Sequence, residues 1–95
     1  MYRIFRASSF EKSFVQLKRS GKFKPAAQKD LEKAIDLLAA DTPLPREYWD
    51  HSLSGVLSEY RECHIKGDTL LVYKKNKREL VLVLVDIGSH SYLFE

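Results

Sequence analysis

A run of six consecutive aliphatic residues, Leu80 to Val85, constrains the fold of this 95-residue chain more than any other feature. A strand with one face in water alternates apolar and polar residues, whereas an unbroken apolar run of this length is typical of a strand covered on both faces. We therefore expect residues 80–85 to form a central strand, which Gly88 ends. The rest of the chain must supply the elements that cover this strand.

Two more strands are predicted just before this run. Residues 57–66 form the first and residues 69–75 the second, with Gly67 and Asp68 as a tight two-residue turn that favours positive φ. A short polar turn at residues 76–78 then leads into the central strand. Together these segments predict an antiparallel meander.

The N-terminal segment predicts a strand followed by a helix. Residues 2–7 are enriched in aromatic and β-branched side chains, as is common in a short strand. Ser8 and Glu11 have the spacing of a capping box, in which the hydroxyl and the carboxylate each bind a free amide at the start of a helix. We therefore expect a helix that begins at Ser8 and ends at Gly21.

A second helix is predicted to begin at Pro25, because the missing N–H of proline costs nothing in the first turn. Residues 41–45 end it, and residues 46–54 read as irregular. Its apolar stripe consists of Ala27, Leu31, Ala34, Ile35 and Leu38. The predicted order is β-α-α-β-β-β in one domain over residues 1–95. This is an α+β fold in which a twisted, mainly antiparallel sheet packs against a helical hairpin.

The bulk properties exclude several classes of protein. The net charge of +3 and the pI near 9.0 permit a polyanionic partner without requiring one. Basic residues cluster at 18–24 and 74–78, where they either bind RNA phosphates or are simply solvated. The single cysteine, Cys63, excludes an intrachain disulfide and fits a reducing compartment. No signal-peptide core or membrane-spanning apolar stretch is present, so we expect a cytoplasmic protein.

The three histidines are the candidates for acid–base chemistry, because imidazole titrates near neutral pH. His64 precedes the first hairpin turn and His90 follows the last strand, so both are expected at one edge of the sheet with Asp68 close by. Isolated histidines are more often structural, and spacing alone leaves both interpretations open. A Cys63–His64 nucleophile pair is not expected, since adjacent strand residues point to opposite faces. Neither a metal nor a cofactor motif is present.

Cleavage of RNA by its own 2′-hydroxyl suits this set of residues. The reaction needs a base for the 2′-proton, an acid for the leaving 5′-oxygen and positive or hydrogen-bonding groups near the phosphate. Histidine, lysine and arginine can meet all three needs without a metal ion.

Three segments resemble motifs of the YafQ branch of the RelE/ParE toxin superfamily. Residues 50–55, DHSLSG, are similar to D-H-x-L-x-G in that family. Residues 60–68, YRECHIKGD, are similar to Y/F-R-x-x-H-x-x-x-D, and residues 71–73 supply the apolar pair and tyrosine that follow. Residues 88–94, GSHSYLF, are similar to the terminal G-S/T-H-x-x-L-F. Order and spacing match over residues 50–94, whereas the N-terminal half agrees only in length and helix placement.

The resemblance implies a RelE-like fold and a toxin that cleaves mRNA on the ribosome, with an antitoxin protein that wraps it and covers its basic groove. No cofactor is implied. His64 or Asp68 would help to remove the 2′-proton, and His90 would protonate the leaving oxygen or brace the phosphate. The resemblance implies that the catalytic positions are His51, His64, Asp68 and His90. RNA-binding positions are predicted at Phe94, Arg61, Lys66 and Lys74, although Arg61 is also interpreted as structural.

Two positions depart from the family pattern. Asp86 stands where close members often carry an arginine that steadies the phosphate, and Thr69 stands where some carry an aromatic residue. A carboxylate at position 86 would repel the substrate if it faced the site. Either Lys66 or another cation takes over, or the activity is weakened. The alternatives are a ParE-like toxin that binds DNA gyrase and an RNA-binding relative with weakened catalysis.

Overall fold

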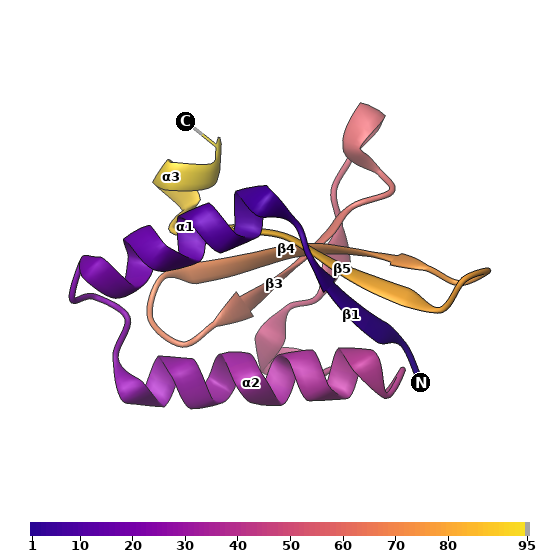
Figure 1. Ribbon diagram of the computed structural model, residues 1–95, viewed down its shortest axis with the longest axis horizontal. Helices are drawn as coiled ribbons and strands as arrows, with labels where there is room; N and C mark the ends of the chain where they lie inside the picture. The colour runs from indigo at the N-terminus through magenta and orange to yellow at the C-terminus, as the bar shows by residue number, and fades with distance from the viewer. Residues whose placement is uncertain (95) are drawn as a thin grey trace.

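A computed structural model describes residues 1–94 of the chain. Its helices and strands are β1 (Arg3–Arg6), α1 (Ser8–Arg19), α2 (Pro25–Ala39), β2 (His51–Ser52), β3 (Arg61–Ile65), β4 (Thr69–Asn76), β5 (Val81–Gly88) and α3 (His90–Phe94). The 3-10 helices η1 (Arg46–Tyr48) and η2 (Gly55–Leu57) flank β2. Within the described residues, five strands form one sheet in the order β1-β5-β4-β3-β2 (Figure 1). Because β1 is parallel to β5 and the other pairs are antiparallel, the predicted α+β class with a mainly antiparallel sheet is confirmed.

The predicted central strand, β5, is an interior strand that lies between β1 and β4. The helices α1 and α2 cover only one of its faces, which differs from the prediction. Leu82 and Leu84 are buried, but the alternating residues Val81, Val83 and Val85 are half-buried. The cover is one-sided because α1 and α2 run in opposite directions along the same face of the sheet (Figure 1). The other face carries neither of these helices and is called the open face below.

The hydrophobic core lies between the sheet and these two helices. Pro25 is the first residue of α2, as predicted. Phe10 of α1 stacks on Phe14 with ring centroids 5.5 Å apart, and Leu31 and Leu38 of α2 pack into the same cluster. From the sheet, this cluster receives Cys63, Ile65, Leu71, Tyr73, Leu82, Leu84 and Ile87.

The predicted capping box at the start of α1 is wrong. Ala7 occupies the N-cap, and its amide still donates to the carbonyl of Leu84 in β5 at 3.0 Å. The helix nevertheless begins at Ser8, as predicted, with Ala7 instead of Ser8 as its N-cap. Glu11 instead pairs with Arg6, its Oε1 lying 3.0 Å from Nε.

The predicted bounds between residues 46 and 68 also need correction. The first meander strand begins at Arg61, not at residue 57, because residues 55–57 form η2. The hairpin turn has three residues rather than two, since Ile65 pairs with Thr69, and Gly67 has a φ of +71° within it. Residues 46–54, predicted to be irregular, contain η1 and the short edge strand β2. The predicted C-terminal tail forms α3 over its described residues.

Candidate active site on the open face

A β-bulge in β5 turns Asp86 onto the open face. Val72 pairs with Asp86, whereas the next residue, Tyr73, pairs with Leu84, so Val85 is an extra residue in β5. Regular alternation would have placed Asp86 on the same face as Leu84, in the core. Bulges commonly re-aim side chains next to active sites, and this one presents a carboxylate to the face that carries the histidines.

The strand register places the histidine groups on that same face. Residues directly opposite each other on paired strands share a face of the sheet. His51 pairs with Glu62, and Glu62 pairs with Val72, so one row runs across the open face from β2 to Asp86 in β5. The neighbouring row runs from His64 through Leu70 to Gly88, shortly before His90.

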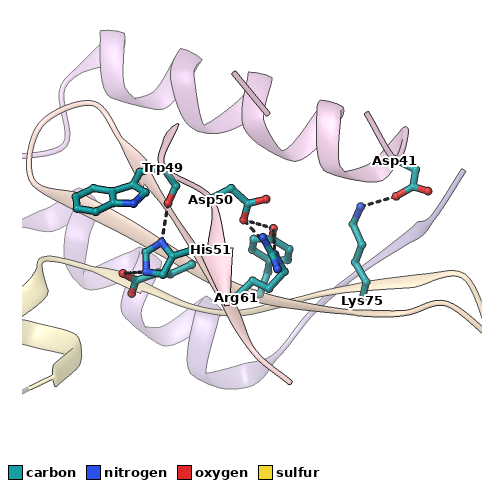
Figure 2. Close-up of polar contacts among 8 residues, drawn as sticks. Asp41, Trp49, Asp50, His51, Arg61 and Lys75 are labelled. Carbon is teal, nitrogen blue, oxygen red and sulfur yellow. Dashed lines mark hydrogen bonds and ion pairs between the residues drawn. The ribbon is translucent and has the colours of Figure 1, made fainter. Parts of the chain in front are cut away.

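His51 is held between two hydrogen-bond acceptors. Its Nδ1 lies 2.7 Å from the carbonyl oxygen of Trp49, and its Nε2 lies 3.1 Å from Oε1 of Glu62 (Figure 2). Because a carbonyl and a carboxylate only accept, both contacts are hydrogen bonds when each ring nitrogen carries a proton. Glu62 is only 7% exposed, and its Oε2 has no hydrogen-bond partner among residues 1–94. Together the two contacts fix the orientation of the His51 ring.

His64 lies beside His51, and both contact the indole of Trp49. The His51 and His64 ring centroids are 6.4 Å apart. Trp49 stacks on His64 with centroids 5.2 Å apart and an interplanar angle of 21°. Asp68 is exposed in the turn after β3, at the same end of this strand as His64. The structure thus gathers His51 and His64 at the β2–β3 side of the sheet.

His90 and Phe94 form a second group at the β5 side. Their ring centroids are 5.3 Å apart on successive turns of α3. Phe94 lines a cavity of about 230 Å³ together with Val72 and Asp86, which places this side of α3 over the open face. With strands about 4.8 Å apart, the backbones of His64 and Gly88 lie about 10 Å apart across β4. The two groups therefore lie on either side of β4.

Gly88 sets the position of α3. A Cβ at this residue would lie 2.6 Å from Cδ2 and 3.2 Å from Cγ of Tyr92. Tyr92 cannot move away freely, because its hydroxyl lies 3.0 Å from Oγ of Ser13 and donates to Oε1 of Gln16 at 3.1 Å. A side chain at position 88 would displace α3 and with it His90.

Gly88→Ala is expected to lower catalysis with little loss of folding. A displacement of about 1 Å can cost about 100-fold in rate. Measurement of RNA cleavage together with thermal unfolding checks this. A control is Gly21→Ala, whose added Cβ meets no atom within 4 Å; its φ of +75° means that alanine should lower stability there without moving α3. Full activity of Gly88→Ala would contradict the positioning role.

Arg61 faces the helices and not the histidines. Its Nε lies 3.3 Å from Oδ1 of Asp50 and 3.3 Å from the hydroxyl of Tyr73, which itself donates to Asp50 at 2.5 Å (Figure 2). Burial, and then the hydrogen bond to Asp50, raise the pKa of Tyr73. These three residues form a clamp, named here the Asp50 clamp, that ties the residue before His51 to β3 and β4. This position favours the structural interpretation of Arg61.

The predicted RNA-binding lysines occupy two different places. Lys74 lies 3.4 Å from Oε1 of Glu59 and over the ring of Tyr60 at 5.3 Å, so its charge is partly engaged. Lys66 is exposed in the hairpin turn. It lines a cavity of about 620 Å³ next to His64, together with Lys29 and Lys33 of α2. Lys66 is therefore the better placed of the two predicted lysines for a phosphate near His64.

Cys63 is fully buried on the helix-facing side, and burial raises the pKa of its thiol to about 12. It therefore does not pair with His64 as a nucleophile, as predicted from the alternation of strand residues. Among residues 1–94, no three His, Cys, Asp or Glu side chains are grouped so as to hold a metal ion. Over the same residues, every helix is too short or too polar to span a bilayer.

Sequence reasoning missed Glu62 and Trp49 as residues of the site. Glu62 had a readable signal, because it lies two residues before His64 in a predicted strand and so shares its face. For Trp49, the only signal in the sequence was that it lies two residues before His51. Its contact with His64 depends on a backbone conformation that no sequence pattern indicates.

Comparison with known proteins places the chain in a family. Residues 2–95 match the family model described as YafQ, bacterial toxin of type II toxin-antitoxin system. The mRNA interferase toxin YafQ of Escherichia coli K12 is 34% identical over 83 residues, which cover 83% of this chain and 88% of that protein. A metal-bound toxin from Helicobacter pylori has 44% identity and a TM-score of 0.86, over 99% of this chain and 100% of that one. YafQ in the E. coli DinJ–YafQ complex has 27% identity and a TM-score of 0.84, with both chains covered fully. The chain belongs to the YafQ family of bacterial toxins of type II toxin–antitoxin systems.

Proposed function

We propose that this chain is a ribosome-dependent endoribonuclease that cleaves mRNA, and that residues 1–95 form its single domain. The observation that carries the proposal is the pair of histidine groups on the open face, His51 with His64 on one side of β4 and His90 on the other. The mRNA interferase name of the E. coli relative supports the choice of RNA as substrate.

The proposed reaction uses the RNA's own 2′-hydroxyl as nucleophile. His64 removes the 2′-proton, with Asp68 as the other candidate base near the same turn. The 2′-oxygen bonds to phosphorus while the bond to the 5′-oxygen breaks, and His90 gives that oxygen a proton. The products are a 2′,3′-cyclic phosphate and a 5′-hydroxyl. Negative charge builds on the phosphate in the transition state, and Lys66, exposed in the hairpin turn beside His64, is a cation placed to stabilise it.

The carboxylate of Asp86 opposes this charge. It faces the same side of the sheet as His51, and its Oδ1 accepts a hydrogen bond from the amide of Ile87 at 2.9 Å. Asparagine keeps that acceptor and removes the charge. A like charge near a phosphate costs about 1 kcal/mol where water screens it, which corresponds to about fivefold in rate.

Asp86→Asn is therefore expected to raise the rate of mRNA cleavage about threefold to tenfold. The measurement is single-turnover cleavage of a ribosome-bound message. Asp36→Asn is the matched control, because Asp36 is exposed on α2, the helix that covers the opposite face. A fall in the rate of Asp86→Asn would instead make this carboxylate part of the proton transfer.

We propose an antitoxin protein as the partner and the cytoplasm as the place of action. A relative with the same fold is solved as the DinJ–YafQ toxin–antitoxin complex, which supports the partner. Cys63 is the single cysteine, so it cannot form an intrachain disulfide, which supports a reducing compartment.

Inducible expression in bacteria tests the proposed function. Cleavage sites on one message are mapped by primer extension, for the wild type and for the His64→Ala/His90→Ala double variant. We expect cuts only with the wild type and only while the message is translated. Growth arrest without cleavage would contradict the proposal and direct attention to a bound target such as DNA gyrase.

A further inference from the structure

Trp49 presents a large aromatic surface beside two of the predicted catalytic histidines. The residue is 67% exposed, although tryptophan is the largest apolar side chain. One face of its indole stacks on His64, and its ring centroid lies 5.8 Å from that of His51. Such high exposure leaves the second face of the indole open to a flat ligand.

The backbone holds Trp49 in this position at a cost to stability. Its φ of +46° lies in the left-handed region, which bulky residues rarely adopt. Both neighbours are anchored: Tyr48 is buried and donates to Oδ1 of Asp30, and Asp50 is held by Tyr73. The anchored neighbours force the strained residue outward. Backbone strain that the surroundings impose in this way is concentrated at functional sites.

A nucleobase is the ligand that fits this surface. Single-stranded RNA is held mainly by stacking of its unpaired bases on aromatic side chains. Position 69 offers no such surface, because Thr69 is small, buried and paired with Ile65. Phe94 lines a cavity with Leu53 and Tyr60, whereas Trp49 is the aromatic ring that stacks on His64 itself.

We propose that Trp49 is a substrate-binding residue whose indole stacks on an unpaired base of the mRNA next to the scissile phosphate. The proposal rests on the proposed function, since the base belongs to the RNA that the histidines cleave. Stacking on Trp49 holds the nucleotide whose 2′-hydroxyl faces His64.

Substitution of Trp49 tests the proposal through cleavage kinetics on ribosome-bound message. Trp49→Ala is expected to lower cleavage efficiency about 5- to 100-fold, the range found for loss of one base–aromatic stack. Trp49→Phe keeps a stacking ring and should lose much less. Because alanine also relieves part of the crowding at this strained residue, thermal stability should not fall with activity. Wild-type efficiency in Trp49→Ala would overturn the proposal.

An abasic message separates stacking on RNA from support of His64. Each base around the cleavage site is removed in turn, and the wild type is compared with Trp49→Ala on every message. If Trp49 stacks on a base, the difference between the two proteins disappears at one abasic position. If Trp49 only braces His64, the difference is the same on all messages, and the proposal fails.

Fluorescence keeps the test independent of catalysis. Trp49 is the only tryptophan in the chain, so its emission reports on this residue alone. A short DNA oligonucleotide, which has no 2′-hydroxyl and so cannot be cleaved by this mechanism, is expected to quench it saturably, and an abasic version should quench less. Quenching by this probe, combined with no cleavage of a ribosome-bound message by the wild type, would sink the proposed function and keep the stacking site. An antitoxin that quenches where this probe does not would overturn the stacking site and assign Trp49 to the protein partner.

Discussion

Replacing His90 by alanine is expected to lower the rate of mRNA cleavage about 100- to 10,000-fold. His90 opens α3 next to the end of β5 and lies with Phe94 over the face that carries His51 and His64. Without a proton donor, the 5′-oxygen must leave as an alkoxide, which is a poor leaving group. His64→Ala should have an effect of similar size, because the 2′-proton then lacks its base.

The control for His90→Ala is Ser91→Ala, the next residue of α3, which is also exposed. Single-turnover rates on ribosome-bound message are compared with circular dichroism spectra of each protein. The double variant should be little slower than either single variant, since residues that act as one unit are not additive. A His90→Ala protein within threefold of the wild type would exclude His90 as the general acid.

Replacing Phe10 by alanine is expected to lower the free energy of unfolding by about 3–5 kcal/mol. Phe10 is 1% exposed, stacks on Phe14 and joins α1 to the core that covers β5. Domains of this size are stable by only about 5–15 kcal/mol, so the variant should be partly unfolded at growth temperature. Urea denaturation followed by circular dichroism gives the change.

Phe5→Ala is the matched control for Phe10→Ala. Phe5 is the same residue type in β1, but its side chain is 59% exposed. Its replacement should cost well under half as much. Equal losses for the two variants would mean that the packing of α1 on the sheet does not dominate stability.

Much of the fold follows from local patterns. The aliphatic run at residues 80–85 correctly indicated an interior strand, and Pro25 correctly indicated the start of α2. The spacing of Ser8 and Glu11 correctly indicated where α1 begins but wrongly indicated a capping box. Ala7 is the N-cap instead, because its amide is held by the hydrogen bond to Leu84 in β5. The packing of both α1 and α2 on one face of β5 also could not be predicted from the sequence. An apolar run does not reveal on which face the helices pack.

The edge strand β2 could not be predicted from the sequence, because two residues are too few to show the alternation of apolar and polar side chains that marks a strand. It forms since His51 and Ser52 pair with β3 while the Asp50 clamp holds the preceding residue. The hairpin length was misjudged because Gly67 with Asp68 fits both a two-residue and a three-residue turn. Pairing of Ile65 with Thr69 settles the choice.

The candidate site was predictable as a set of residues but only in part as an arrangement. The motifs named His51, His64, Asp68 and His90, and the strand ends suggested one edge of the sheet. The structure does place His64 and Gly88, two residues before His90, in one row at the same end of the strands, with β4 between them. Asp86 faces the site only because Val85 is a bulge, and a bulge has no sequence signal of its own. Trp49 depends on a left-handed backbone, which is likewise not readable from the sequence.

Chemical analysis of the ends of the cleaved mRNA is the most direct test of the 2′-hydroxyl mechanism. The purified protein is given a ribosome-bound message, and the fragments are examined by mass spectrometry. The His64–His90 arrangement predicts a 2′,3′-cyclic phosphate on the upstream fragment and a 5′-hydroxyl on the downstream one, with no cut at a 2′-deoxy nucleotide. A 3′-hydroxyl and a 5′-phosphate, or continued cleavage of the 2′-deoxy message, would contradict it.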